Sequence, residues 1–167
     1  DSFHFGRVCG FFEKNRDFAL PHELAIVMAQ LTCYQGKLPQ GAPTSPIITN
    51  YICQIFDMRI LKIAKKYHLD YTRYADDLSF STNDKKFISQ WEPFYNELTY
   101  EVERAGFKIN TKKTSVQYKD SRQTVTGLVI NKKLSVDHRY YKQVRAMADS
   151  LYKTGCFDNN GVEGTVS

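Results

Sequence analysis

The sequence Leu-Asp-Tyr-Thr-Arg-Tyr-Ala-Asp-Asp-Leu-Ser-Phe-Ser at residues 69–81 decides the fold that we predict for this chain. Asp76 and Asp77 stand between two short runs rich in aromatic and β-branched residues, and such runs are typical of two strands joined by a tight turn. We therefore expect both aspartates at the tip of a hairpin. Adjacent carboxylates repel one another unless water or a multivalent cation lies between them, so a magnesium site is one interpretation. The other is an ordinary turn facing solvent, because short motifs match by accident.

Length and composition indicate one domain or part of one. The chain has 167 residues, 42% of them hydrophobic and 14% aromatic, which is ordinary for a globular protein with a core. No run approaches a membrane span, and the first residues lack the basic start and apolar stretch of a signal peptide. The four cysteines have no zinc-ligand spacing. We expect a cytoplasmic protein with buried free thiols, and a fragment, since the first residue is Asp rather than Met.

The positive charge is concentrated in the C-terminal part of the chain. The net charge is +5, and residues 105–145 hold ten Lys or Arg against two Asp, whereas the remainder holds thirteen basic and sixteen acidic residues. One interpretation is a polyanion partner, bound through phosphate contacts that weaken as salt increases. The other is a solvated lysine-rich face, which charge alone indicates equally well.

The loop at residues 37–46, Lys-Leu-Pro-Gln-Gly-Ala-Pro-Thr-Ser-Pro, precedes the longest predicted helix. Its three prolines and glycine exclude regular structure. Ser45 is a suitable N-cap with Pro46 at the first helical position, and apolar residues at helical spacing continue to about Tyr67. Such a loop presents backbone N–H groups and a helix N-terminus to phosphate or a nucleotide, or it is a rigid structural turn.

The remaining pattern predicts an α+β fold in which helices cover one face of a small antiparallel sheet. Four other helices are predicted. The first covers residues 5–13, the second begins at Pro21, the third runs from residue 84 to about 105, and the fourth runs from residue 137 to about 153. Besides the hairpin, the predicted strands cover residues 107–109, 114–118, 124–130 and 133–136, with a turn at 131–132. Residues 157–167 are polar and uncapped, and we expect them to be the start of an element that continues beyond residue 167.

Four segments of the chain together resemble a known family, in the order in which that family has them. They are Leu38–Pro46, Tyr74–Asp77, Gly106–Thr114 and Val125–Asn131. They resemble, in turn, the loop before the long palm helix, the catalytic turn, the basic segment behind the active site and the primer-grip region of reverse transcriptases. The last piece is similar to the bacterial retron type. Each piece is a weak to moderate signal alone, but their order and spacing argue against coincidence. The resemblance implies a polymerase palm, a ferredoxin-like antiparallel sheet with helices packed on one face.

The resemblance also implies a role for each matching residue. Asp76 and Asp77 would be ligands in a two-metal Mg²⁺ site for nucleotidyl transfer to a primer 3′ hydroxyl. Lys113, or Lys112 beside it, would stabilise or protonate the leaving pyrophosphate, although adjacent lysines in a turn are equally a surface feature. The other implied residues are Gln40, Gly41 and Ala42 at the incoming nucleotide, Tyr74 and Ala75 beneath the primer end, and Thr126 and Gly127 at the primer backbone. The implied partners are an RNA template, a DNA or RNA primer and deoxynucleoside triphosphates.

The chain departs from the family's pattern at its start. A third aspartate is expected roughly half a dozen residues before Asp1, on a strand beside the catalytic hairpin, and Asp1 itself does not align with it. With two of three expected carboxylates, the isolated chain is expected to be inactive or nearly so. We expect a palm fragment over 1–155 and a truncated connection towards the thumb over 156–167, with the N-terminal strand, fingers and thumb missing. The sheet edge left exposed predicts pairing with another chain, and hence a homodimer.

Two other hypotheses remain at this stage. The first is a palm-derived module that no longer polymerises and instead holds a structured RNA or a partner protein. The second is an intron-encoded or other bacterial reverse transcriptase. The intact Tyr-Ala-Asp-Asp at 74–77 favours catalysis over the first, and Val-Thr-Gly at 125–127 favours the retron type over the second.

Overall fold

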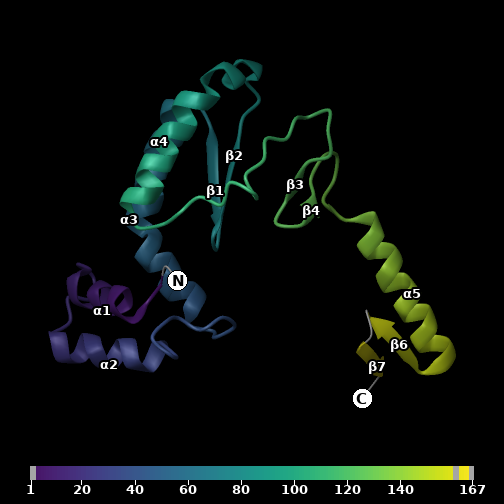
Figure 1. Ribbon diagram of the computed structural model, residues 1–167, viewed down its shortest axis with the longest axis horizontal. Helices are drawn as coiled ribbons and strands as arrows, with labels where there is room; N and C mark the ends of the chain where they lie inside the picture. Colours follow the sequence, from purple (N-terminus) through teal and green to yellow (C-terminus); the bar gives the residue numbers. More distant parts are fainter. Residues whose placement is uncertain (1–2, 160–161, 166–167) are drawn as a thin grey trace. The chain divides into compact units, whose positions relative to one another are not determined.

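The computed structural model describes residues 3–159 and 162–165, and the chain divides into two compact units (Figure 1). Unit 1 covers Asp1–Thr114 and unit 2 covers Ser115–Ser167. Helices and antiparallel strands both occur, so the prediction of an α+β fold is confirmed. Asp1, which does not align with the family's aspartate, lies outside the described residues.

Three helices form the first core of unit 1. Helix α1 (Phe5–Lys14) and helix α2 (His22–Thr32) lie side by side and pack with the start of α3 (Ser45–Lys66) (Figure 1). Helices α1 and α3 begin and end close to the residues that hydrophobic periodicity indicated, and α2 begins directly after Pro21. The buried side chains that they share are Val8, Cys9, Phe12, Ala25, Ala29 and Ile48.

The start of α3 differs from the prediction in one detail. Thr44, not Ser45, is the residue before the helix, and no side chain caps this end. The Ser45 hydroxyl instead donates a hydrogen bond of 2.7 Å to the carbonyl oxygen of Pro39. The N-cap prediction was wrong because the folded loop offers that hydroxyl a carbonyl acceptor, which the sequence pattern of a helix start does not reveal.

The hairpin of β1 (Asp70–Tyr74) and β2 (Asp77–Ser81) forms where the sequence predicted it. Helices α3 and α4 (Trp91–Arg104) cover one face of this hairpin (Figure 1). A 3₁₀ helix, η1 (Lys85–Gln90), precedes α4, and Asp84 caps it by accepting a hydrogen bond of 2.8 Å from the Lys86 N–H. The buried residues between these elements are Cys53, Phe56, Ile60, Ile63, Ala64, Leu69, Phe94, Leu98 and Val102.

The segment after α4 is irregular, so the predicted strands at 107–109 and 114–118 were wrong. Gly106 ends the helix with a φ of 77°, as expected for a left-handed residue after a C-terminus. The side chains of Phe107 and Ile109 then pack against the buried residues that lie between α3, α4 and the hairpin. Asn110 starts a local turn by accepting backbone hydrogen bonds from Lys113 and Thr114. Local turn bonds and core packing thus replace strand pairing here.

Unit 2 contains a three-stranded sheet in the order β3-β4-β5, formed by Thr124–Val125, Leu128–Val129 and Ser135–Val136. The single strand predicted over 124–130 is wrong, because Thr126 and Gly127 have φ values of 48° and 85° and turn the chain back on itself. Strands β4 and β5 do pair on either side of the predicted turn at 131–132. Helix α5 (His138–Thr154) follows, with Asp137 as its N-cap.

The last described residues form a hairpin of β6 (Cys156–Asn159) and β7 (Val162–Thr165). The sequence indicated only a polar, uncapped tail from residue 157, and it did not indicate these two strands. Residues 160–161 and 166–167 of the predicted connection lie outside the described residues. No helix in the described part of the chain combines the length and the apolar character that crossing a bilayer needs.

Candidate active site at the β1–β2 turn

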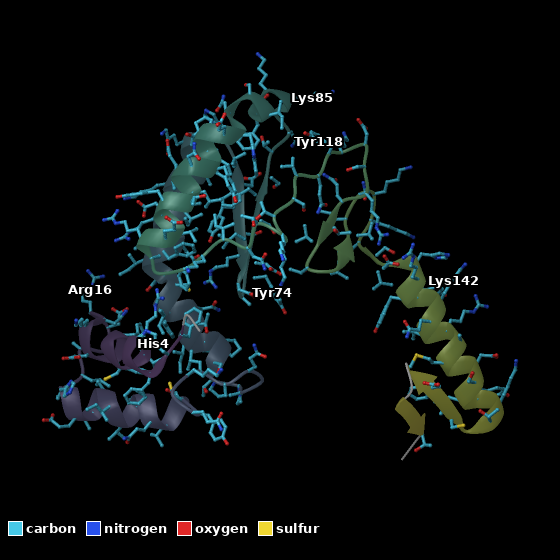
Figure 2. The ribbon with its side chains drawn as sticks, in the orientation of Figure 1. His4, Arg16, Tyr74, Lys85, Tyr118 and Lys142 are labelled. Atoms are coloured by element: carbon cyan, nitrogen blue, oxygen red, sulfur yellow. The ribbon has the colours of Figure 1, made fainter. Side chains whose placement is uncertain are left out.

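The β1–β2 hairpin has a loop of two residues, Ala75 and Asp76, because Tyr74 and Asp77 are Cα partners. Partners in an antiparallel pair point to the same face of the sheet, and successive residues alternate between faces. Tyr74 and Asp77 therefore lie on the outer face, whereas Arg73 lies on the inner face, towards α3. Tyr74 is 72% exposed and lies at the end of the hairpin (Figure 2).

Asp76 and Asp77 are both exposed at this end of the hairpin. Carboxylate oxygens are the hard ligands that Mg²⁺ prefers, and this ion commonly uses one or two protein carboxylates together with waters and substrate phosphates. The pair therefore fits part of a magnesium site. Within residues 3–159 and 162–165, no cluster of three His, Cys, Asp or Glu side chains could hold a metal ion.

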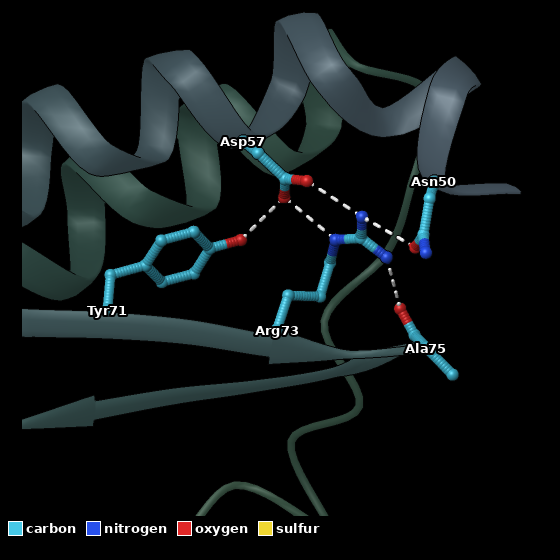
Figure 3. Close-up of polar contacts among 5 residues, drawn as sticks. All are labelled: Asn50, Asp57, Tyr71, Arg73 and Ala75. Carbon is cyan, nitrogen blue, oxygen red and sulfur yellow. Dashed lines mark hydrogen bonds and ion pairs between the residues drawn. The ribbon is translucent and has the colours of Figure 1, made fainter. Parts of the chain in front are cut away.

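Arg73 connects the turn to helix α3 (Figure 3). Its Nε and one terminal nitrogen donate to the two carboxylate oxygens of Asp57, each at 2.7 Å. The same terminal nitrogen lies 3.2 Å from Oδ1 of Asn50. The other terminal nitrogen donates to the backbone carbonyl of Ala75 at 3.0 Å. A single guanidinium thus contacts the helix and the turn that precedes Asp76.

Burial strengthens this network. The Arg73 side chain is 8% exposed and that of Asp57 is 30% exposed, so water screens their ion pair only in part. The hydrogen bond to Asp57 raises the pKa of Arg73. Burial first, and then its hydrogen bond of 2.8 Å to Asp57, raise the pKa of Tyr71. Tyr71 therefore stays a neutral donor to Asp57 throughout the physiological pH range.

The predicted nucleotide-binding residues lie in the loop between α2 and α3. Gln40 and Gly41 are exposed, and Ala42 is half-buried. Gly41 has a φ of 85°, a conformation that costs little only for glycine. This loop leads into the first turns of α3, and Asn50 on α3 contacts Arg73. Helix α3 thus links the loop to the hairpin.

The remaining predicted site residues lie in two other turns. Lys112 and Lys113 are exposed in the turn that Asn110 organises, where Oδ1 of Asn110 accepts from the Lys112 N–H at 3.2 Å. Thr126 and Gly127 form the turn between β3 and β4 in unit 2. The roles of these residues stay predictions.

Comparison with known proteins decides the family. Residues 17–138 match the family model described as reverse transcriptase (RNA-dependent DNA polymerase). The chain belongs to the reverse transcriptase family. Retron Ec86 reverse transcriptase of Escherichia coli is 36% identical to it over 145 residues, which is 83% of this chain and 44% of that protein.

Two relatives from Myxococcus xanthus are also of the retron type. Retron Mx162 reverse transcriptase is 46% identical over 101 residues, covering 56% of this chain and 21% of that protein. Retron Mx65 reverse transcriptase is 38% identical over 127 residues, covering 76% of this chain and 29% of that protein. The predicted relationship to retron reverse transcriptases is thereby confirmed, and the chain spans less than half the length of each of these relatives.

Sequence reasoning about this reverse transcriptase chain missed Asp57, Asn50 and Arg73. A signal for Arg73 was present, because strand alternation from the half-buried Tyr71 places it on the inner face of the hairpin. A charged residue at an inward position requires a partner. The sequence did not show which residue of α3 that partner is, since the pairing depends on how the helix packs over the strand.

Proposed function

We propose that this chain is the palm of a retron-type RNA-directed DNA polymerase, which extends a primer on an RNA template with deoxynucleoside triphosphates. The observation that carries the proposal is the exposed tip of the β1–β2 hairpin, where Asp76 and Asp77 are adjacent. It lies inside the segment that matches the reverse transcriptase model. The ferredoxin-like palm sheet is part of this proposal, and the hairpin with α3 and α4 on one face supports it.

In this proposal each part of the site has a separate task. Asp76 and Asp77 hold Mg²⁺, which when bound activates the primer hydroxyl and stabilises the charge on the triphosphate. The 3′ hydroxyl gives up its proton to solvent as its oxygen forms a bond to the α-phosphorus, and the bond from that phosphorus to the pyrophosphate oxygen breaks. Lys113, or Lys112 beside it, stabilises the departing pyrophosphate. Gln40, Gly41 and Ala42 face the incoming nucleotide, Tyr74 and Ala75 lie beneath the primer end, and Thr126 and Gly127 position the primer backbone.

The 167-residue chain by itself is proposed to extend primers poorly. Its described residues offer the Asp76–Asp77 pair no third metal-ligating side chain, whereas the family's pattern implies three carboxylates at this site. Pairing of two copies through an exposed edge of the two-stranded β1–β2 sheet is a further part of the proposal.

Primer extension by the full-length protein tests the function. We expect Mg²⁺-dependent extension of a primer annealed to RNA, its loss in Asp76→Asn, and nearly unchanged RNA binding by that variant. Asp84→Asn is the matched control, because Asp84 is an exposed aspartate of the same unit that caps η1, and Asn is also a good N-cap. RNA binding without any extension by the wild type would contradict the proposal and favour a non-catalytic RNA-binding module.

A further inference from the structure

The turn that carries Asp76 holds Ala75 in an unfavourable backbone conformation. Ala75 has a φ of 53°, in the left-handed region that residues with a Cβ atom rarely adopt. Glycine is the usual residue where a hairpin turn needs such an angle. Because alanine does not favour this conformation by itself, contacts from the surroundings must hold it.

Arg73 supplies such a contact. Its terminal nitrogen donates to the Ala75 carbonyl at 3.0 Å, and its other donors are fixed by Asp57 and Asn50 on α3 (Figure 3). A guanidinium has five N–H donors in one rigid plane. Once Asp57 has oriented that plane, the donor to Ala75 points in a defined direction.

The orientation of the Ala75 carbonyl affects the backbone orientation of the next residue, Asp76. The peptide group is planar and trans, so its C=O and the following N–H point in opposite directions. Holding the oxygen of Ala75 towards Arg73 therefore fixes the peptide plane that leads into Asp76. That plane fixes where the nitrogen and Cα of Asp76 lie, so, together with the φ of Asp76, it sets the direction in which the side chain leaves the backbone.

We infer that Arg73, oriented by Asp57 and Asn50, is a positioning residue that sets the direction of the Asp76 carboxylate through the Ala75 carbonyl. The part of this inference that concerns catalysis rests on the proposed function. The competing explanation is that the Arg73–Asp57 ion pair only attaches the hairpin to α3, so that its loss would lower stability without a specific effect at the turn.

Two substitutions separate these explanations. Arg73→Lys keeps the positive charge beside Asp57, but one ammonium lacks the planar fork that reaches Asp57 and the Ala75 carbonyl together. Tyr71→Phe is the matched control, because it removes a hydrogen bond of 2.8 Å to the same Asp57 carboxylate and leaves the contact from Arg73 to Ala75 in place. Both variants weaken the attachment of the hairpin to α3, but only Arg73→Lys removes the hydrogen bond to the Ala75 carbonyl in the turn.

Kinetics of the full-length protein provide the first measurement. We expect Arg73→Lys to lower the kcat of primer extension roughly 10- to 100-fold, the scale associated with misplacing a reacting group by about 1 Å. KM for the incoming nucleotide should change less than about 2-fold, as for an interaction that acts in the transition state. Tyr71→Phe should stay within about 2-fold of the wild-type kcat. Equal effects of the two variants on kcat, or no effect of Arg73→Lys, would overturn the inference.

Backbone NMR provides a second measurement that does not depend on activity. Amide order parameters of Ala75, Asp76 and Asp77 report motion of the turn on the picosecond to nanosecond timescale. They should fall in Arg73→Lys and stay at wild-type values in Tyr71→Phe. If the wild type extends no primer, the proposed function fails, and these order parameters alone decide whether Arg73 positions the turn. Unchanged order parameters in Arg73→Lys would overturn that role.

Discussion

Phe94 is the side chain whose removal should most weaken the support of the hairpin. It is 1% exposed on α4, and its ring centroid lies 5.0 Å from that of Phe80 on β2 and 5.4 Å from that of Phe87 on η1. Phe94→Ala removes this packing and leaves a cavity, which costs about 3–5 kcal/mol of unfolding free energy. That is a large part of the roughly 5–15 kcal/mol that a domain of this kind has.

Urea denaturation followed by circular dichroism measures this cost. With a slope of about 1–3 kcal/mol per molar urea, the midpoint of Phe94→Ala should fall by more than about 1 M. If the alanine variant does not fold, Phe94→Leu replaces it, with an expected loss of about 1.5 kcal/mol. Tyr100→Ala is the control, because Tyr100 lies on the same helix but is 64% exposed, so its change should stay within about 0.5 kcal/mol. A loss below about 1 kcal/mol for Phe94→Ala, or equal losses at the two positions, would refute the packing described here.

Two further predictions concern pH and thiol chemistry. The Lys66 ammonium first, and then the Tyr67 hydroxyl at 2.9 Å, lower the pKa of Glu97 by hydrogen bonding. This contribution to stability is present above the unfolded pKa of about 4.3 and is lost as pH falls through the lowered folded pKa. The urea midpoints of wild type and Glu97→Gln should therefore differ at pH 7 and converge as the pH falls below that folded pKa. A difference that stays constant with pH would contradict the assignment. Cys53 is 3% exposed, and burial raises the pKa of its thiol. Iodoacetamide at pH 8 should therefore alkylate the half-buried Cys156 before Cys53. Equal alkylation rates of the two thiols, measured by mass spectrometry, would contradict the burial of Cys53.

The elements that sequence predicts well here are those with a strong period. Helix α3 carries buried residues at helical spacing, including Ile48, Phe56 and Ile60, and strand β1 of the hairpin alternates between exposed and half-buried positions. Both patterns arise from one face packing against a core, so they are visible in the chain before the fold is known. The same reasoning places Asp76 and Asp77 at the hairpin tip.

The errors arise where a local interaction competes with the pattern. Phe107 and Ile109 have strand-like alternation, but their side chains pack on the core without a partner strand. The Thr126–Gly127 pair bends a predicted strand into a tight turn, and the glycine was the available signal. For the last hairpin the Asn-Gly sequence at 160–161 was an unused signal of the same kind.

The contact of Arg73 with Asp57 belongs to a third class. The two residues are sixteen positions apart, and no local pattern links them. The inward position of Arg73 predicts that a partner exists, but the packing of α3 over the hairpin selects Asp57 and Asn50. The Tyr-Ala-Asp-Asp motif at 74–77 was therefore readable from the sequence, whereas the contacts of Arg73 that support its turn were not.

Iron-mediated cleavage tests the central claim, that Asp76 and Asp77 hold a divalent metal at the hairpin tip. Fe²⁺ replaces Mg²⁺ in the full-length protein, and added ascorbate and peroxide generate radicals that cut the backbone beside the bound ion. We expect cuts next to the β1–β2 turn that are suppressed by excess Mg²⁺, absent in Asp76→Asn and retained in Asp84→Asn. Cuts only at other places, or a wild-type pattern in Asp76→Asn, would contradict it.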